Sequence, residues 1–327
     1  MSQVISLRDS AVYGQLARES AVVALTAAGP SGEPALRPLL GESLNWDEVV
    51  NLARRERAVG PVARDLTRLG TGTVPTPVLE RLGRMGMVTD FHLASLHDRL
   101  GKLLALYARH DIDALLLKGA GLAYSAYASV EERPMGDIDL LVHPDVADRA
   151  WKLAVENGWR RRKDVAEERS YEDHQHLSPL EDADGLQIGL EIHIALFTQQ
   201  APFTLPTSSL WERARRITIA GAPALVPSAE DQLVHAALHF AWSHEMTFGT
   251  WRTLRDVERI VTSNPLDWAQ VVTRAQAIRG GTCCYWTLRL ARDLAGVAVP
   301  DTVLDALSPR LPEPVLRRLT CYFAQQA

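Results

Sequence analysis

Asp137 and Asp139 are the first residues of this sequence whose types and spacing could do chemistry. They open the segment 137–142, in which acidic and apolar side chains alternate. Residues i and i+2 of a β-strand point to the same face, so the two carboxylates would project together while the apolar side chains between them point into a core. An Asp pair alone is more often a turn or surface feature, so its surroundings decide its meaning.

A second segment, 187–194, alternates in the same way and would place Glu191 and His193 on one face of another strand. Three carboxylates that converge repel one another unless a cation compensates their charge. Hard oxygen ligands of this kind select Mg²⁺ or Mn²⁺. Two such ions about 3.5–4 Å apart can stabilise both the attacking and the leaving oxygen of an in-line displacement.

The elements before the acidic pair must supply the rest of a site. The apolar run 114–117 predicts a buried strand, the segment Lys118–Gly121 predicts a glycine-rich turn, and a helix is expected over 122–128. The backbone N–H groups of such a turn and the N-terminus of a helix can bind phosphates. Lys118 can pair with triphosphate charge or reach solvent as a strand-end lysine. Arg133 can anchor either a phosphate or its own loop.

Helical patterns flank this centre. Apolar residues that recur every three or four positions predict a helix up to about residue 110, interrupted near Gly83 and Gly86. The pattern is helical again from Ser228 onward. The basic run that begins at Arg160 is typical of a solvated helix end or loop. The predicted organisation is an N-terminal helical region at 1–95, a core at 96–225 and a C-terminal helical bundle at 226–327.

Three segments together resemble the uncharacterised nucleotidyltransferase family of the polymerase-β-like superfamily. They are Leu117-Lys-Gly-Ala-Gly-Leu122, Arg133-Pro-Met-Gly-Asp-Ile-Asp-Leu-Leu-Val142 and Leu190-Glu-Ile-His193. The resemblance covers roughly residues 90–260. It implies an α+β fold with a nucleotidyltransferase-type mixed β-sheet core. It also implies Mg²⁺-dependent transfer of NMP from an NTP to a hydroxyl or phosphate acceptor, with pyrophosphate as the leaving group.

The resemblance further implies that Asp137 and Asp139 bind both metal ions. Glu191, as the third carboxylate, would bind the catalytic ion and help to deprotonate the acceptor hydroxyl. The predicted nucleotide-binding residues are Lys118, Gly119, Ala120, Gly121, Arg133 and His193. The superfamily usually has Gly-Gly or Gly-Ser at the turn, so backbone amides and Lys118 would replace the contact of a serine hydroxyl.

Other interpretations stay open. His174, His176 and His193 could form a zinc site with Glu191, because H-x-H on one strand face is a metal-ligand spacing. The Asp pair favours a harder ion. His193 could instead orient Glu191, contact substrate or be a plain hydrogen-bonded histidine. The alternatives to a transferase are a non-catalytic nucleotide-binding or scaffold protein and a metal-dependent phosphohydrolase that uses the same carboxylates.

Composition limits the partners. The chain has 327 residues and a net charge of −5, which weighs against a broad nucleic-acid-binding surface. A small molecule or a protein or peptide side chain is therefore the expected acceptor rather than RNA. The 3 cysteines show no C-x-x-C spacing, and no segment has the length of apolar sequence that spans a membrane. We expect a cytoplasmic protein without a membrane partner.

Overall fold

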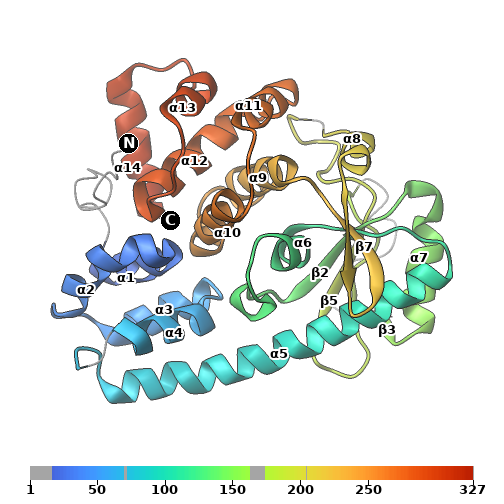
Figure 1. Ribbon diagram of the computed structural model, residues 1–327, viewed down its shortest axis with the longest axis horizontal. Coiled ribbons are helices and arrows are strands. Elements are labelled where there is room, and N and C mark those ends of the chain that lie inside the picture. The colour runs from blue at the N-terminus through green and yellow to red at the C-terminus, as the bar shows by residue number, and fades with distance from the viewer. Residues whose placement is uncertain (1–16, 70–71, 163–173, 204, 327) are drawn as a thin grey trace. The chain divides into compact units, whose positions relative to one another are not determined.

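The computed structural model describes residues 17–69, 72–162, 174–203 and 205–326. Its internal contacts separate two compact units (Figure 1). One unit holds the chain up to Thr89 together with the chain from Leu233 onward, and the other holds Asp90–Gln232. The division of the chain into domains at 1–95, 96–225 and 226–327 remains a prediction.

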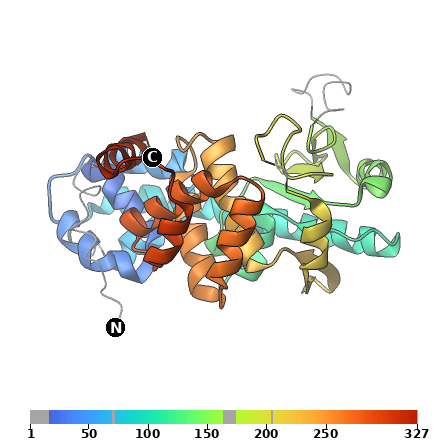
Figure 2. The same ribbon diagram turned by 90° about the horizontal axis from the view of Figure 1, so that it is seen from above.

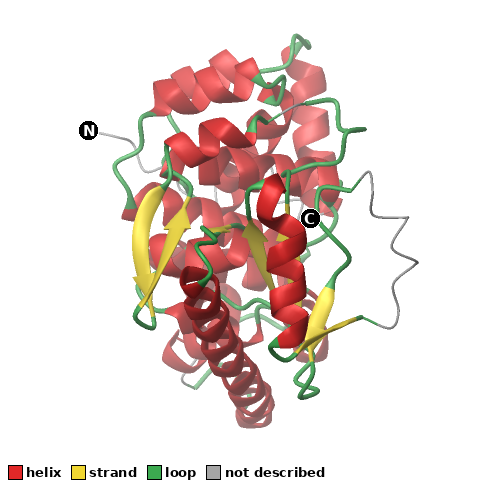
Figure 3. Cartoon of the chain, turned by 90° about the vertical axis from the view of Figure 1, so that its right-hand side faces the viewer, coloured by secondary structure: helices red, strands yellow, loops and turns green. Residues whose placement is uncertain are grey.

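The second unit contains a mixed sheet, as the sequence predicts (Figure 3, strands in yellow). Its strands are β1 (Leu115–Leu116), β2 (Asp137–Leu141), β3 (Trp159–Arg161), β4 (Leu180–Asp182), β5 (Gly189–His193), β6 (Arg215–Ile219) and β7 (Ala222–Val226). Across the described part of the chain, 7 strands follow the order β3-β4-β5-β2-β1-β7-β6. Strand β2 runs parallel to β5 and β1 parallel to β7, while the other pairs are antiparallel.

Three helices contribute to the main core on one face of the sheet: α5 (Thr76–Arg109), α6 (Lys118–Ser125) and α7 (Ala147–Glu156). The apolar stripe of α5 is buried there, and Ile138 and Leu140 of β2 point into the same core. The predicted interruption of α5 at its glycines is wrong, because the helix continues through Gly83 and Gly86. A Cβ added at Gly83 would meet no atom within 4 Å, so this glycine does not mark a close contact.

A smaller apolar cluster lies on the other face of the sheet. Leu115, Leu117 and Leu141 pack there against Leu196 and Leu210. The last of these belongs to α8 (Thr207–Glu212). Because side chains alternate along β2, Asp137 and Asp139 share this second face with Leu141. The main core therefore packs against one face of the sheet, and the acidic residues lie on the opposite face, which carries the smaller apolar cluster.

Two sheet elements differ from the sequence prediction. The sequence predicts a helix end or loop for the basic run, but Arg160 and Arg161 belong to the edge strand β3, while Lys163 lies outside the described residues. The hairpin of β6 and β7 was not predicted. Ala220 and Gly221 both have positive φ, at 49° and 81°, which is typical of a two-residue hairpin turn.

The other unit is helical in its described residues, and Figure 2 shows its helices from above. Its N-terminal helices, besides the start of α5, are α1 (Arg18–Ala27), α2 (Glu33–Leu40), α3 (Trp46–Arg55) and α4 (Val59–Leu69). Its C-terminal elements are the π-helical turn η7 (His239–Ser243) and the helices α10 (Thr250–Ser263), α11 (Trp268–Ala277), α12 (Gly281–Ala295), α13 (Asp301–Leu307) and α14 (Glu313–Gln326). The helix α9 (Ala229–Leu238) runs across the boundary between the units. No described helix has both the length and the apolar character needed to cross a membrane.

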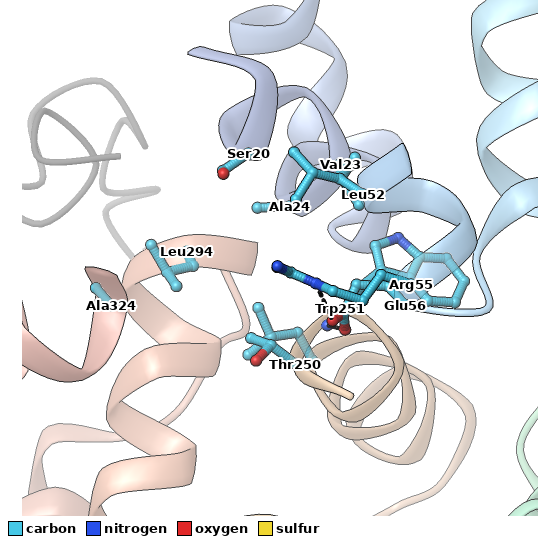
Figure 4. A pocket seen from close by; sticks show the side chains of 11 residues that line it. Ser20, Val23, Ala24, Leu52, Arg55, Glu56, Thr250, Trp251, Leu294 and Ala324 are labelled. Atoms are coloured by element: carbon cyan, nitrogen blue, oxygen red, sulfur yellow. Dashed lines mark hydrogen bonds and ion pairs between the residues drawn. The ribbon is translucent and has the colours of Figure 1, made fainter. Parts of the chain in front are cut away.

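Glu56 joins the two halves of the helical unit. Its Oε2 accepts a hydrogen bond of 3.1 Å from the backbone N–H of Trp251 in the first turn of α10. The side chains lie around a cavity of about 30 Å³ (Figure 4). Oε1 has no hydrogen-bond donor among the described residues and lies 3.7 Å from Nε of Arg55. Burial raises the pKa of this carboxyl, although the Trp251 N–H and Arg55 favour its ionised form.

Glu56→Gln is expected to raise the unfolding temperature at neutral pH. The folded protein binds the proton of Glu56 more tightly than the unfolded chain does. The contribution of Glu56 to stability is therefore complete below its unfolded pKa and is lost as pH rises through the folded pKa. Glutamine keeps an acceptor for Trp251 without the buried charge, so its advantage should shrink on acidification. The unfolding temperatures of Glu56→Gln and the wild type are compared at neutral pH and below pH 4.5. A variant that is less stable than the wild type by the same amount at both pH values would contradict this prediction.

Candidate active site

The register of β2 and β5 brings two of the predicted carboxylates side by side. Asp139 lies opposite Glu191, and Asp137 lies opposite Gly189. Partners in a parallel pair point to the same face, so the two strands together offer a continuous acidic surface. A Cβ on Gly189 would lie 3.2 Å from Cβ of Asp137, which is tighter than ordinary contact. Glycine at this position therefore leaves room for the Asp137 side chain.

Lys118 reaches this surface from the start of α6. The backbone N–H of Leu117 donates to the carbonyl oxygen of Asp139 at 3.0 Å, which fixes the chain beside β2 just before the lysine. Lys118 itself has a φ of 45°, in the left-handed region. Its Nζ lies 2.7 Å from Oδ1 of Asp139 and 3.7 Å from Oε2 of Glu191. The ammonium group thus contacts both carboxylates.

His193 is the second cationic partner of the same two carboxylates. Its Nε2 lies 2.9 Å from Oδ1 of Asp139 and 3.4 Å from Oε2 of Glu191. Its Nδ1 lies 3.3 Å from the carbonyl oxygen of Ala195. The side chains of Asp139 and His193 are 3% and 1% exposed, whereas that of Glu191 is 23% exposed. Glu191 therefore remains open to a ligand while Asp139 is enclosed by its partners.

The charges stabilise one another electrostatically. Burial alone would raise the pKa of Asp139, but the charge of Lys118 and the hydrogen bond from His193 hold that pKa well below its usual range. Burial would also lower the pKa of Lys118, yet the carboxylates of Asp139 and Glu191 raise it. The pKa of His193 is raised as well, because the same two carboxylates outweigh its burial. Asp139 and Lys118 therefore form a charged pair in the absence of any ligand.

The other predicted site residues have different surroundings. Asp137 is exposed at the start of β2, and its charge helps to raise the pKa of Lys118. Arg133 is 5% exposed, and its Nη1 donates to the carbonyl oxygen of Pro134 at 2.6 Å. This contact fits the anchoring of its own loop. His176 packs its ring against His193, with the ring centroids 5.3 Å apart.

The segment Lys118–Gly121 is not a turn, contrary to the prediction. The helix α6 already begins at Lys118, so Gly119, Ala120 and Gly121 form its first turn. A Cβ on Gly121 would lie 2.6 Å from the backbone oxygen of Leu116 in β1. A Cβ on Gly119 would meet Cβ and Sδ of Met135 at 3.2 Å. The glycines allow α6 to pack closely on the sheet, and the sharp change of direction falls on Lys118.

Gly121→Ala is expected to destabilise the protein by about 1–3 kcal/mol, the usual range for overpacking a core. Its Cβ would clash with backbone, which has to shift with the strand it belongs to. Chemical denaturation measures the change in the free energy of unfolding. Gly83→Ala is the matched control, because this glycine also lies inside a helix and its added Cβ would meet no atom within 4 Å. A free energy of unfolding unchanged by Gly121→Ala would contradict the packing role.

A divalent metal fits the donor atoms of this cluster. Among the described residues, one group of three or more possible ligands has its atoms within 4.8 Å of one another: Asp139, Glu191 and His193. Two carboxylates and an imidazole are ordinary ligands of divalent ions. Asp137 is not in this group, although it lies on the same face of β2. His193 is in it, whereas the sequence predicts this histidine among the nucleotide-binding residues, with a zinc site that includes Glu191 as the alternative.

The mixed sheet, with seven strands in the described residues, and the helical N- and C-terminal regions are consistent with a nucleotidyltransferase-type fold. The chain belongs to the uncharacterised nucleotidyltransferase family, whose family model matches residues 42–296. The match extends beyond the segment that carries the sequence resemblance and includes helices of the helical unit as well as the whole sheet. A search of curated proteins found no match to the chain.

Proposed function

We propose that this protein is a metal-dependent nucleotidyltransferase that transfers NMP from an NTP to a hydroxyl or phosphate acceptor. The observation that carries the proposal is the parallel pairing of Asp139 with Glu191, with Lys118 in contact with both. Membership of a nucleotidyltransferase family supports this class of reaction. The predicted ion is Mg²⁺, with Mn²⁺ as the alternative.

In this proposal the acidic surface holds the ion through Asp139 and Glu191, with Asp137 beside them. The ion would supply charge stabilisation to the reacting phosphate oxygens. Glu191, the more exposed of the paired carboxylates, accepts the proton of the acceptor hydroxyl. The acceptor oxygen then forms a bond to the α-phosphorus, and the bond from that phosphorus to the bridging oxygen of pyrophosphate breaks.

Lys118 provides positive charge for the phosphates. Its side chain is 24% exposed, and the residue lies in the first turn of α6, whose N-terminal backbone N–H groups also favour anions. Gly119 and Ala120 would contribute only their backbone to this contact. Arg133 keeps the loop before β2 in place by its bond to Pro134, and so positions the acidic strand. The acceptor is proposed to be a small molecule or a protein or peptide side chain.

Binding of nucleotide with metal is the first test of this proposal. Thermal unfolding is compared for ATP, GTP, CTP and UTP, each with and without Mg²⁺ or Mn²⁺. A metal-dependent stabilisation by at least one nucleotide is expected in the wild type and in Asp145→Asn, which removes an exposed carboxylate outside the cluster. The Asp137→Asn/Asp139→Asn double variant is expected to lose it. Equal stabilisation of the double variant would place nucleotide elsewhere and contradict the site.

A further inference from the structure

An imidazole nitrogen lies where an all-carboxylate metal centre would have only oxygen. Nε2 of His193 lies 2.9 Å from Oδ1 of Asp139 and 3.4 Å from Oε2 of Glu191. In the part of the chain that the structure describes, the three groups are the possible ligands whose atoms lie within 4.8 Å of one another, and Asp137 is not among them. The donor atoms that converge here are therefore two oxygens and one nitrogen.

The ring of His193 is held in the orientation that a metal ligand requires. Nδ1 faces the carbonyl oxygen of Ala195, which can only accept a hydrogen bond, so this nitrogen carries a proton. Nε2 points at the carboxylates and donates to Oδ1 of Asp139 at 2.9 Å in the ligand-free cluster, so a metal ion bound at Nε2 would take the place of that proton. A backbone carbonyl on the remote nitrogen is the usual support of a metal-bound histidine.

The backbone of His193 is fixed on both sides. Its carbonyl oxygen accepts a hydrogen bond from the N–H of Val142 at 3.0 Å. His193 also forms an isolated antiparallel bridge with His176. The ring of His176 packs edge-on against that of His193. Nδ1 of His176 lies 2.8 Å from the carbonyl oxygen of Leu177, which fixes that ring in turn. The nitrogen donor is thus part of a rigid arrangement.

We infer that His193 is a metal ligand through Nε2, and that it makes this centre select Mn²⁺ over Mg²⁺. The inference rests on the proposed function, whose choice of ion it narrows. Mg²⁺ is a hard ion that prefers oxygen, whereas transition-metal ions also bind imidazole. The carboxylates and the phosphates of a nucleotide supply hard oxygens as well, and Mn²⁺ accepts both kinds of donor.

Electron spin-echo spectroscopy of the Mn²⁺-loaded full-length protein tests the inference without reference to activity. Nitrogen modulation from a directly bound imidazole is expected in the wild type. It should change when the protein is prepared with histidine containing the heavier nitrogen isotope, a control that requires no mutation. His143→Asn, which removes an exposed histidine stacked on Trp211, is expected to leave the modulation intact.

Calorimetric titration of His193→Gln with each ion supplies the second measurement. Loss of the nitrogen is expected to weaken Mn²⁺ binding by at least about 10-fold, the lower end of what loss of a ligand-orienting partner costs, and Mg²⁺ binding by clearly less. Mn²⁺ binding without nitrogen modulation in the wild type would overturn the inference and leave the proposed function standing. Failure of the wild type to bind either ion, with or without nucleotide, would instead overturn the metal-dependent function itself.

Discussion

Asp139→Asn is expected to reduce metal-dependent pyrophosphate release by at least about 100-fold. Loss of a group that only supports a metal ligand costs up to about 100-fold in activity, and loss of the ligand itself should cost no less. Oδ1 of Asp139 contacts both basic side chains of the cluster: Nζ of Lys118 lies 2.7 Å away and Nε2 of His193 lies 2.9 Å away. Asparagine keeps the shape of the side chain but removes the charge that both cations share. Steady-state release of pyrophosphate under saturating NTP and metal measures the effect.

Two further measurements separate a chemical effect from a folding defect. The circular dichroism spectrum of Asp139→Asn is expected to match the wild type, because the substitution keeps the volume of the buried side chain. Asp145→Asn is the matched control and should retain wild-type activity. Near-normal turnover of a correctly folded Asp139→Asn protein would remove Asp139 from the catalytic centre.

Lys118→Met is expected to change metal binding and turnover in opposite directions. The ammonium group of Lys118 contacts Asp139 and Glu191, so it competes with an ion for the same carboxylates. Methionine retains much of the length of the chain without the charge. The variant should bind the divalent ion more tightly in the absence of nucleotide. Because positive charge for the phosphates is lost, it should also lose at least about 100-fold in kcat/KM for the NTP.

Lys102→Met is the control for this prediction. Lys102 is an exposed lysine that pairs with Asp98 on α5, and its loss should alter neither quantity. Metal titration of the nucleotide-free protein and steady-state kinetics measure the two effects separately. Weaker metal binding in Lys118→Met would show that the lysine supports the metal site rather than competing for it.

The acidic strands were predictable because they depend on a local pattern. Alternation with a period of two identified the apolar face of β2 and correctly sent Ile138 and Leu140 into the main core. The same pattern predicted that Glu191 and His193 share one face, and both lie at the cluster. No local pattern defines a mixed, nucleotidyltransferase-type sheet. That prediction came from the family resemblance, which the match over residues 42–296 confirms.

What the sequence could not supply depends on contacts between distant segments. The register that sets Asp139 opposite Glu191 is a property of two strands far apart in the chain. The convergence of His193 on Asp139 follows from that register, so the alternation pattern alone could not distinguish a ligand from a substrate contact. The early start of α6 also depends on packing, because Gly121 is required by the backbone of Leu116.

Covalent transfer of the α-phosphate is the most direct test of the account. The protein is incubated with metal, an NTP labelled at the α-phosphate and a fractionated cell extract as the source of acceptor, and the fate of the label is followed beside pyrophosphate release. The account predicts that label becomes covalently attached to an acceptor in proportion to the pyrophosphate formed, in wild type and Asp145→Asn but not in Asp139→Asn. Label recovered only as free nucleoside monophosphate would contradict a transferase and indicate a phosphohydrolase that uses the same carboxylates.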